Sequence, residues 1–137
     1  FEELQAMFDA KQIVPSECGG NSSLHNATGA GRGYAVAGGV AEAIEKCINE
    51  YYPGVPVHIE HAEGLAECKK ALMLAKAGKL DGYLLEGMAC PGGCVAGAGT
   101  IRPVRESAMN VTQFKQRAKL QSAMETPFAA RLKDVEE

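Results

Sequence analysis

Long apolar runs, a strong net charge and an even set of cysteines are all missing from this 137-residue sequence. No run approaches the roughly 18 apolar residues of a membrane-spanning helix, so we expect no transmembrane segment. The net charge is -3, with acids and bases interspersed, which gives no reason to expect binding to nucleic acid or to an anionic membrane surface. The length suits one domain with a core of moderate size.

The five cysteines are odd in number, and their spacings do not suggest a disulfide framework, so we predict a reducing, cytoplasmic location. Cys47 and Cys68 fall at apolar positions of predicted helices and are interpreted as small buried side chains. Cys18 lies in a loop without a second cysteine at metal-ligand spacing, and its role stays open. No secretory leader is visible, and because the sequence begins at Phe1 we expect a fragment or a trimmed chain.

The most informative stretch is residues 86–99, where Cys90 and Cys94 are separated by Pro-Gly-Gly and followed by more glycines. The apolar residues 83–85 directly before it predict a buried strand. Thiolates are the preferred ligands of iron–sulfur clusters, and glycines let backbone N–H groups approach the sulfides. The stretch therefore suits a soft metal centre, although a Cys-x3-Cys pair alone is equally typical of two ordinary thiols.

A second glycine-rich stretch, Gly29-x-Gly31-x-Gly33, runs into a helix predicted over residues 36–52. A dinucleotide site is rejected because no strand precedes these glycines and their spacing is wrong for that fingerprint. Two interpretations of the glycines stay open. The helix start presents backbone N–H groups to an anionic ligand, or the glycines, including Gly38 and Gly39 inside the helix, serve close packing alone.

Apolar periodicity predicts an α/β fold with a parallel sheet and flanking helices. A strand, a helix with Leu65 and Leu72 facing inward, and a second strand form one right-handed crossover, which places the two cysteines at the carboxyl end of a parallel strand. The three histidines, His25, His58 and His61, are interpreted as structural or exposed. The predicted elements are helices over 1–12, 36–52, 65–77 and 111–124, strands over 55–61 and 82–86, and a loop over 16–33.

The segment after Pro103 is predicted to be a scaffold. Asn110 and Gln113 fit a capping box for the helix at 111–124, with Met109 and Phe114 placed for a hydrophobic staple. Thr126-Pro127 begins a last predicted helix, with Phe128 and Leu132 facing inward.

The pattern Glu-x-Met-x-Cys-x-x-Gly-Cys-x-x-Gly-x-Gly, from Glu86 to Gly99, resembles the third cluster-binding signature of the iron-only (di-iron) hydrogenases, with all seven fixed positions filled. Residues 28–43 look like the glycine-rich segment that precedes this signature in the same family. Together the resemblance covers roughly residues 1–105. It implies one α/β lobe of the hydrogenase catalytic domain over residues 1–137, with a helical tail from about 104.

The resemblance also implies the chemistry. In that family four cysteines hold a 4Fe-4S cluster, and one of them bridges to a di-iron subcluster that carries carbon monoxide and cyanide. The intact enzymes, typical of anaerobes, interconvert hydrogen with protons and electrons. By position, Cys90 would be a cluster ligand and Cys94 the bridging ligand, while Gly93 and Gly97 would be cofactor-binding glycines. Met88 would pack against the di-iron unit.

Three pocket positions come from the upstream segment of the resemblance. Tyr34 occupies a position that is usually aromatic, Val40 one that lines the pocket, and Ala35 one whose backbone N–H faces a diatomic ligand. Tyr34 replaces the usual Phe, and Thr100-Ile101 replaces the usual Gln-Pro. These departures suggest a divergent member of the family.

The two earlier cysteine signatures of the family are missing from this sequence. We therefore expect this chain alone to carry no cluster and to be inactive, and we expect its partners to be the remaining N-terminal part of the domain, and a ferredoxin-like electron carrier or a signalling domain. Alternatives to the enzyme are a hydrogen-sensing module and a non-catalytic relative in iron–sulfur assembly. A fragment would expose a sheet edge and an apolar wall around Tyr34, Val36 and Val95, which predicts a homodimer.

Overall fold

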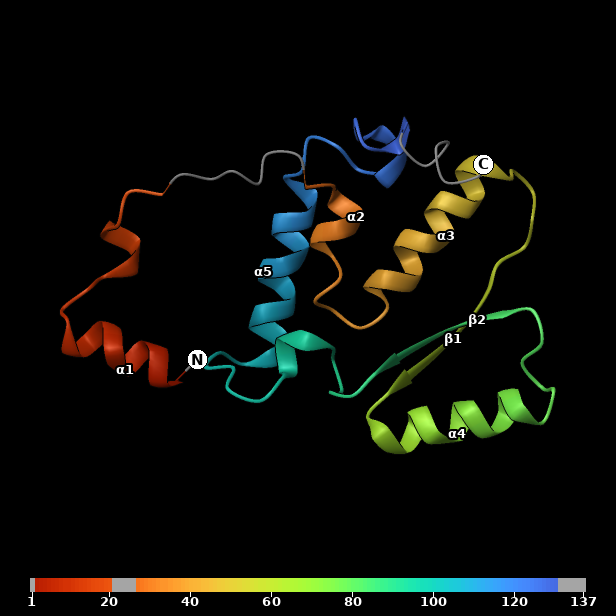
Figure 1. Ribbon diagram of the computed structural model, residues 1–137, viewed down its shortest axis with the longest axis horizontal. Helices are drawn as coiled ribbons and strands as arrows, with labels where there is room; N and C mark the ends of the chain where they lie inside the picture. The colour runs from red at the N-terminus through yellow and green to blue at the C-terminus, as the bar shows by residue number, and fades with distance from the viewer. Residues whose placement is uncertain (1, 21–26, 131–137) are drawn as a thin grey trace.

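The computed structural model describes residues 2–20 and 27–130, which form helices around a small parallel sheet (Figure 1). None of the helices in these two ranges is long and apolar enough to cross a membrane. The elements in chain order are α1 (Glu2–Ala10), η1 (Pro15–Glu17), α2 (Gly29–Arg32), α3 (Gly39–Tyr51), β1 (His58–Glu63), α4 (Leu65–Lys76), β2 (Tyr83–Met88), η2 (Cys94–Ala96), α5 (Val104–Gln116) and η3 (Ala123–Glu125).

Strands β1 and β2 pair in parallel, in a register that runs from His58 opposite Tyr83 to Glu63 opposite Met88. The connecting helix α4 packs below the sheet and α3 lies above it in the view of Figure 1. On the α4 side, a Cβ added to Gly87 would lie 3.3 Å from the sulfur of Cys68, so that helix approaches the strand closely. The predicted α/β class and the parallel strand–helix–strand unit are confirmed.

The predicted helix over 36–52 is wrong at its start. The chain forms the short helix α2, then an irregular segment, and α3 begins only at Gly39. Gly38 has φ +87°, which ends any continuous helix before it. A Cβ on Gly39 would lie only 2.1 Å from the carbonyl oxygen of Gly33, so these two backbone segments touch. The Gly-Gly pair therefore marks the start of the helix and not its interior.

Both strands lie further along the chain than predicted. Strand β1 covers residues 58–63 in place of 55–61, and β2 continues through Glu86 to Met88. The pairing extends because the N–H of Gly64, just past β1, still donates to the carbonyl of Met88 at 2.7 Å. Consequently the strand runs past Glu86 to Met88, and only Ala89 separates the end of the sheet from Cys90 in the sequence.

The predicted bounds and cap of the tail helix are also wrong. Helix α5 starts after Pro103 and ends at Gln116, so Asn110 lies inside the helix and does not cap it. The carbonyl of Pro103 accepts the N–H of Ser107, which begins the helical ladder well before the predicted start. Phe128 is exposed, not inward, and the stretch around it forms turns. Leu132 lies outside the described residues.

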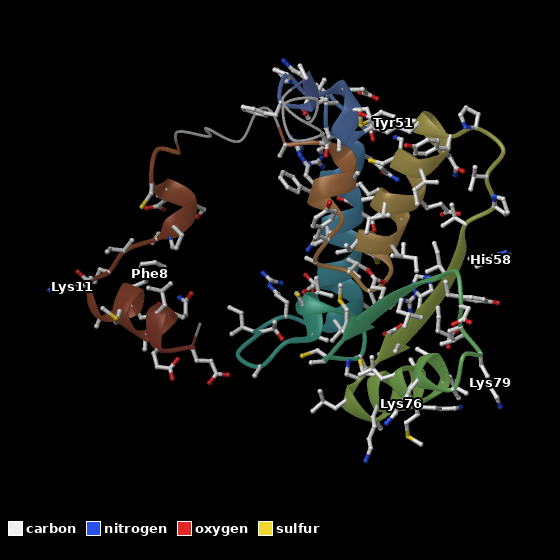
Figure 2. All side chains as sticks on the ribbon, turned by 45° about the vertical axis from the view of Figure 1, so that its right-hand side comes forward. Phe8, Lys11, Tyr51, His58, Lys76 and Lys79 are labelled. Atoms are coloured by element: carbon white, nitrogen blue, oxygen red, sulfur yellow. The ribbon has the colours of Figure 1, made fainter. Side chains whose placement is uncertain are left out.

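The interior is thin, in contrast to the predicted core of moderate size. The buried apolar residues of the described ranges are all alanines except for Val95. Leu65 and Leu72 of α4, expected to face inward, are 75% and 66% exposed. The chain exposes 10183 Å², whereas a compact monomer of 14.4 kDa would expose about 6,800 Å². Figure 2 shows α1 with Phe8 standing apart from the sheet, and no residue of α1 is buried.

Candidate functional site

The two cysteines lie in a turn that follows β2, here named the cysteine loop (residues 89–97). Gly92 and Gly93 have φ +94° and +93°, a backbone conformation that other residues rarely adopt. The N–H of Gly93 donates to the carbonyl of Cys90 at 2.9 Å, which closes the turn, and Cys94 then opens η2. Cys90 is half-buried and Cys94 is exposed, so both thiols are carried by a tightly folded backbone at the end of a strand.

The cysteine loop rests directly on the segment between α2 and α3, here named the glycine loop (residues 33–38). The N–H of Ala37 donates to the carbonyl of Gly92 at 3.2 Å, and the N–H of Val95 donates to the carbonyl of Ala35 at 3.1 Å. A Cβ on Gly93 would lie 2.5 Å from the nitrogen of Ala37 and 2.8 Å from the carbonyl oxygen of Ala35. The two loops therefore meet backbone to backbone, with a contact that only glycine permits at Gly93.

A carboxylate ties the cysteine loop to β1 as well. The N–H of Gly92 donates to Oε2 of Glu63, the last residue of β1, at 2.6 Å. A hydrogen bond to a charged acceptor is stronger than one between neutral groups. The turn that carries the thiols is thus held on two sides, by the glycine loop and by the end of the neighbouring strand.

Glu86 makes the densest set of polar contacts near the loops. Its Oε1 accepts the N–H groups of Val40 and Ala41, at 3.0 and 3.1 Å, and its Oε2 contacts Nδ1 of His61 at 3.0 Å. Burial raises the pKa of this carboxyl group, but hydrogen bonds from the Ala41 N–H, from His61, and from the Gly38 and Val40 N–H groups together lower the pKa below its ordinary value. Glu86 is therefore ionised at neutral pH and occupies the amino end of α3.

Sequence reasoning missed the roles of Glu86 and His61. An anionic ligand was one of the two interpretations of the glycine-rich helix start, and the anion found there is the chain's own carboxylate. Glu86 was visible as the first fixed position of the signature. Its partner His61 could not be recognised because the sequence predicts that the first strand ends at His61. The strand in fact continues to Glu63, and His61 lies opposite Glu86 in the parallel register.

The four residues predicted to line the pocket, Met88, Val40, Ala35 and Tyr34, lie in three different places. Met88 and Val40 line one hollow of about 230 Å³ between β2 and α3, so the structure brings these two together. Ala35 lies under the cysteine loop through its contact with Val95. Tyr34 lines a neighbouring apolar hollow with Tyr51 and residues of α3, and its ring is not in the hollow of Val40 and Met88. Gly97 ends η2, donating its N–H to the carbonyl of Cys94, and a Cβ there would lie 3.1 Å from that oxygen.

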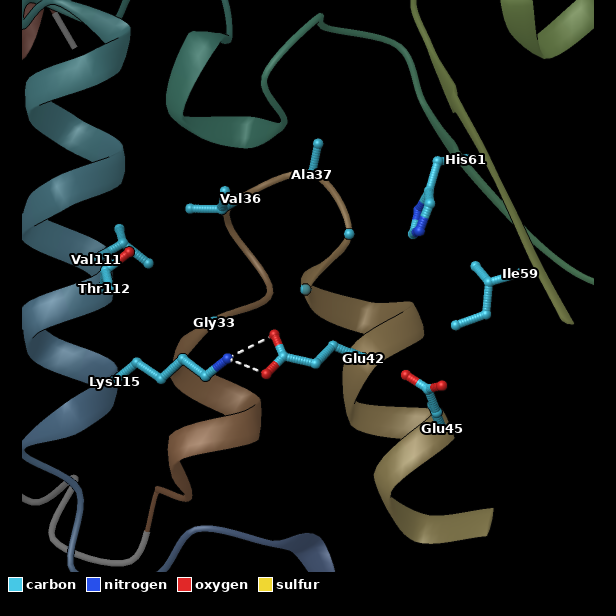
Figure 3. A pocket seen from close by; sticks show the side chains of 12 residues that line it. Gly33, Val36, Ala37, Glu42, Glu45, Ile59, His61, Val111, Thr112 and Lys115 are labelled. Carbon is cyan, nitrogen blue, oxygen red and sulfur yellow. Dashed lines mark hydrogen bonds and ion pairs between the residues drawn. The ribbon is translucent and has the colours of Figure 1, made fainter. Parts of the chain in front are cut away.

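A separate cavity of about 240 Å³ is lined by residues of the glycine loop and lies between α3, α5 and β1 (Figure 3). Lys115 of α5 reaches across it to both carboxylate oxygens of Glu42, and Glu45 and His61 also line it. No cysteine lines this cavity. Its ion pair joins α5 to α3, and the cavity is separate from the thiols.

The donor set can be compared with the needs of an iron–sulfur cluster. A 4Fe-4S cluster takes four cysteine thiolates. Within residues 2–20 and 27–130, no group of three or more His, Cys, Asp or Glu side chains is placed to hold a metal ion. Cys68 is engaged elsewhere, with its sulfur near the carbonyls of Ala62 and Met88. The described residues therefore do not fit a complete cluster, and Cys90 and Cys94 would provide half of its ligands.

A family described as the iron-only hydrogenase large subunit, C-terminal domain, matches residues 1–98. The match includes the glycine loop, the Glu86 carboxylate and the cysteine loop as far as Gly97. Among curated proteins, no sequence matches this chain.

Proposed function

This chain belongs to the C-terminal domain family of the iron-only hydrogenase large subunit, and we propose that it forms one wall of an active centre that interconverts hydrogen with protons and electrons. In this proposal Cys90 and Cys94 are two of the four cluster thiolates. The other two come from a separate stretch of polypeptide, the N-terminal part of the catalytic domain, and a ferredoxin-like protein exchanges electrons with the assembled centre.

The observation that carries the proposal is the backbone contact between the two loops. Gly93 has room for no side chain against Ala35 and Ala37, and two hydrogen bonds join the same segments. A cysteine turn held in this way keeps both thiols in place before any ligand arrives, which lowers the entropic cost of binding a cluster. A pair of unrelated buried thiols would need no such support.

The thin interior supports the need for a second polypeptide. Within residues 2–20 and 27–130 the sheet has two strands, each with an open edge, and large apolar side chains lie exposed on the glycine loop, α3 and α4. Parallel sheets are normally buried on both faces and have more strands. The exposed side chains are Tyr34, Ile44, Tyr51, Leu65, Leu72 and Met73. We infer that the N-terminal part of the domain covers some of this surface when the centre assembles.

The proposal is tested by anaerobic co-expression of the chain with a separate N-terminal part of an iron-only hydrogenase domain that carries the two earlier cysteine signatures. We expect the pair to co-purify with iron and sulfide and to reduce a viologen dye under hydrogen. Cys94→Ala should abolish both the dye reduction and the di-iron content. The matched control is Cys47→Ala, which removes a half-buried thiol of α3 that lines a different hollow from Val40 and Met88 and should change neither.

The same experiment separates the alternative functions. A pair that binds the full iron complement but turns over hydrogen very slowly would be a sensing module. A pair that binds a 4Fe-4S cluster without a di-iron unit would be a relative used in iron–sulfur assembly. Full activity with Cys94→Ala would overturn the assignment of both cysteines.

A further inference from the structure

One carboxylate joins three elements next to the cysteine loop. Glu86 lies on β2, its register partner His61 lies on β1, and the two N–H groups that it accepts belong to the first turn of α3. The side chain of Glu86 is only 8% exposed, whereas the imidazole of His61 is 47% exposed. The carboxylate is thus enclosed between the sheet and the helix, and its partners Val40, Ala41 and His61 lie on other elements.

The position of this carboxylate along the chain links it to the predicted pocket. Glu86 and Met88 are two apart on β2 and share the face of the strand that looks toward α3. The carboxylate of Glu86 accepts the N–H of Val40, the residue of α3 that lines the same hollow as Met88. Glu86 therefore fixes the separation of the two walls of that hollow.

The chemistry of the contacts requires a carboxylate. Oε1 accepts two N–H groups at the amino end of a helix of 13 residues, where the helix dipole favours negative charge. A carboxylate can only accept, so Nδ1 of His61 carries the proton that it shares with Oε2. An amide in place of the carboxylate would keep one accepting oxygen, but it would remove the charge and turn an NH2 group toward a donor.

We propose that Glu86 is a positioning residue, whose carboxylate sets the cysteine loop and Met88 against the glycine loop and Val40. This role rests on the proposed function of the two loops as walls of one centre. The simpler alternative is that Glu86 only caps α3. In that case its removal would loosen the first turn of the helix but leave the contact between the two loops unchanged.

The experiment measures amide hydrogen exchange in the purified chain at neutral pH, which requires no cluster. In Glu86→Ala we expect exchange at Val40 and Ala41 to become about tenfold faster or more, as for loss of a hydrogen bond to a charged group. Exchange should also become faster at Ala37 and Val95, whose N–H groups join the two loops. Glu86→Gln should give an intermediate effect, and Glu86→Asp should not rescue, because its shorter side chain reaches fewer partners.

The matched control is Glu125→Ala. It removes a carboxylate that likewise accepts a backbone N–H, that of Gln121 at 2.9 Å, but that belongs to η3. It should leave the amides of both loops unchanged. Faster exchange at Val40 and Ala41 with unchanged exchange at Ala37 and Val95 would show a cap alone and would overturn the positioning role. Far-UV circular dichroism checks that each variant keeps its helices.

A second measurement separates this role from the proposed function. In the co-expressed pair, Glu86→Gln should retain the iron bound by wild type but lower the rate of dye reduction severalfold. If wild type itself binds no iron, the proposed function fails while the exchange result still stands. If Glu86→Gln and Glu86→Ala both turn over hydrogen at the wild-type rate, the positioning role fails while the proposed function stands.

Discussion

Replacement of Gly93 by alanine tests the contact between the two loops most sharply. The added Cβ would lie 2.5 Å from the nitrogen of Ala37, 2.8 Å from the carbonyl oxygen of Ala35 and 2.9 Å from the carbonyl carbon of Val36. All three are backbone atoms, so no flexible side chain can move aside. The backbone at Gly93 is also in the positive-φ region, at +93°.

Two costs add in this variant. A non-glycine residue at the φ of +93° and ψ of −163° of Gly93 costs about 1–3 kcal/mol, and forcing an extra carbon into a packed contact costs about 1–3 kcal/mol. The expected loss is therefore about 2–6 kcal/mol, a large fraction of the 5–15 kcal/mol by which domains are typically stable. Part of this cost is avoided if the cysteine loop lifts off the glycine loop, and the amides of Ala37 and Val95 would then exchange faster.

The assay is urea unfolding followed by circular dichroism, with Gly54→Ala as the matched control. Gly54 has nearly the same φ, +90°, but a Cβ there would meet nothing within 4 Å. Gly54→Ala thus measures the cost of a side chain at positive φ without any added contact. We expect Gly93→Ala to be less stable than this control by about 1–3 kcal/mol. Equal losses in the two variants, with unchanged exchange at Val95, would refute the close contact between the loops.

Three further predictions concern pH, association and catalysis. The pKa of Glu86 is lowered from 4.5, so its contribution to stability is complete above that pH and is lost as the pH falls through the folded-state value; the difference in unfolding free energy between wild type and Glu86→Gln should shrink below about pH 4.5, and a constant difference would contradict this. The chain alone should form a dimer through its exposed apolar surface, which is centred on Tyr34, Ile44 and Tyr51 because Val95 is buried. Light scattering should show that Tyr51→Glu is monomeric, and a wild-type monomer at tens of micromolar would be contrary evidence. In the co-expressed pair, Met88→Leu should keep the bound iron and change the rate of dye reduction, because it alters packing without removing a ligand; loss of iron would show a different role for Met88.

The parallel strand–helix–strand unit could be predicted because its first strand alternates apolar and polar residues and its second is a short apolar run. Its helix ends at Lys76, two residues before Gly78, which has the positive φ of a C-terminal cap. The start of α3 could not be predicted in the same way. Gly39 begins that helix because its backbone touches Gly33, and this contact exists only in the folded chain. Periodicity alone extends the helix backwards through both glycines.

For the tail helix and the interior too, local sequence patterns did not predict what the folded chain does. Asn110 and Gln113 have the spacing of a capping box, but the helix already begins at Val104, so a local signal was overridden by the ladder that starts at Pro103. Leu65 and Leu72 have the spacing of an inward face, yet α4 turns Ala71 and Cys68 toward the sheet. Apolar periodicity identifies a face that needs cover, and it does not say which polypeptide covers it.

The most direct test of the central claim is the iron content per chain after anaerobic reconstitution with ferrous iron and sulfide, with and without the separate N-terminal part of a hydrogenase domain. Two thiolates are half of a four-cysteine site, so we predict no stoichiometric iron in the chain alone and at least four iron atoms per chain in the complex. Cys90→Ser should lower the iron content of the complex. A stable 4Fe-4S cluster in the chain alone, without bridging between two copies, would contradict the claim that its thiols are half of a shared site.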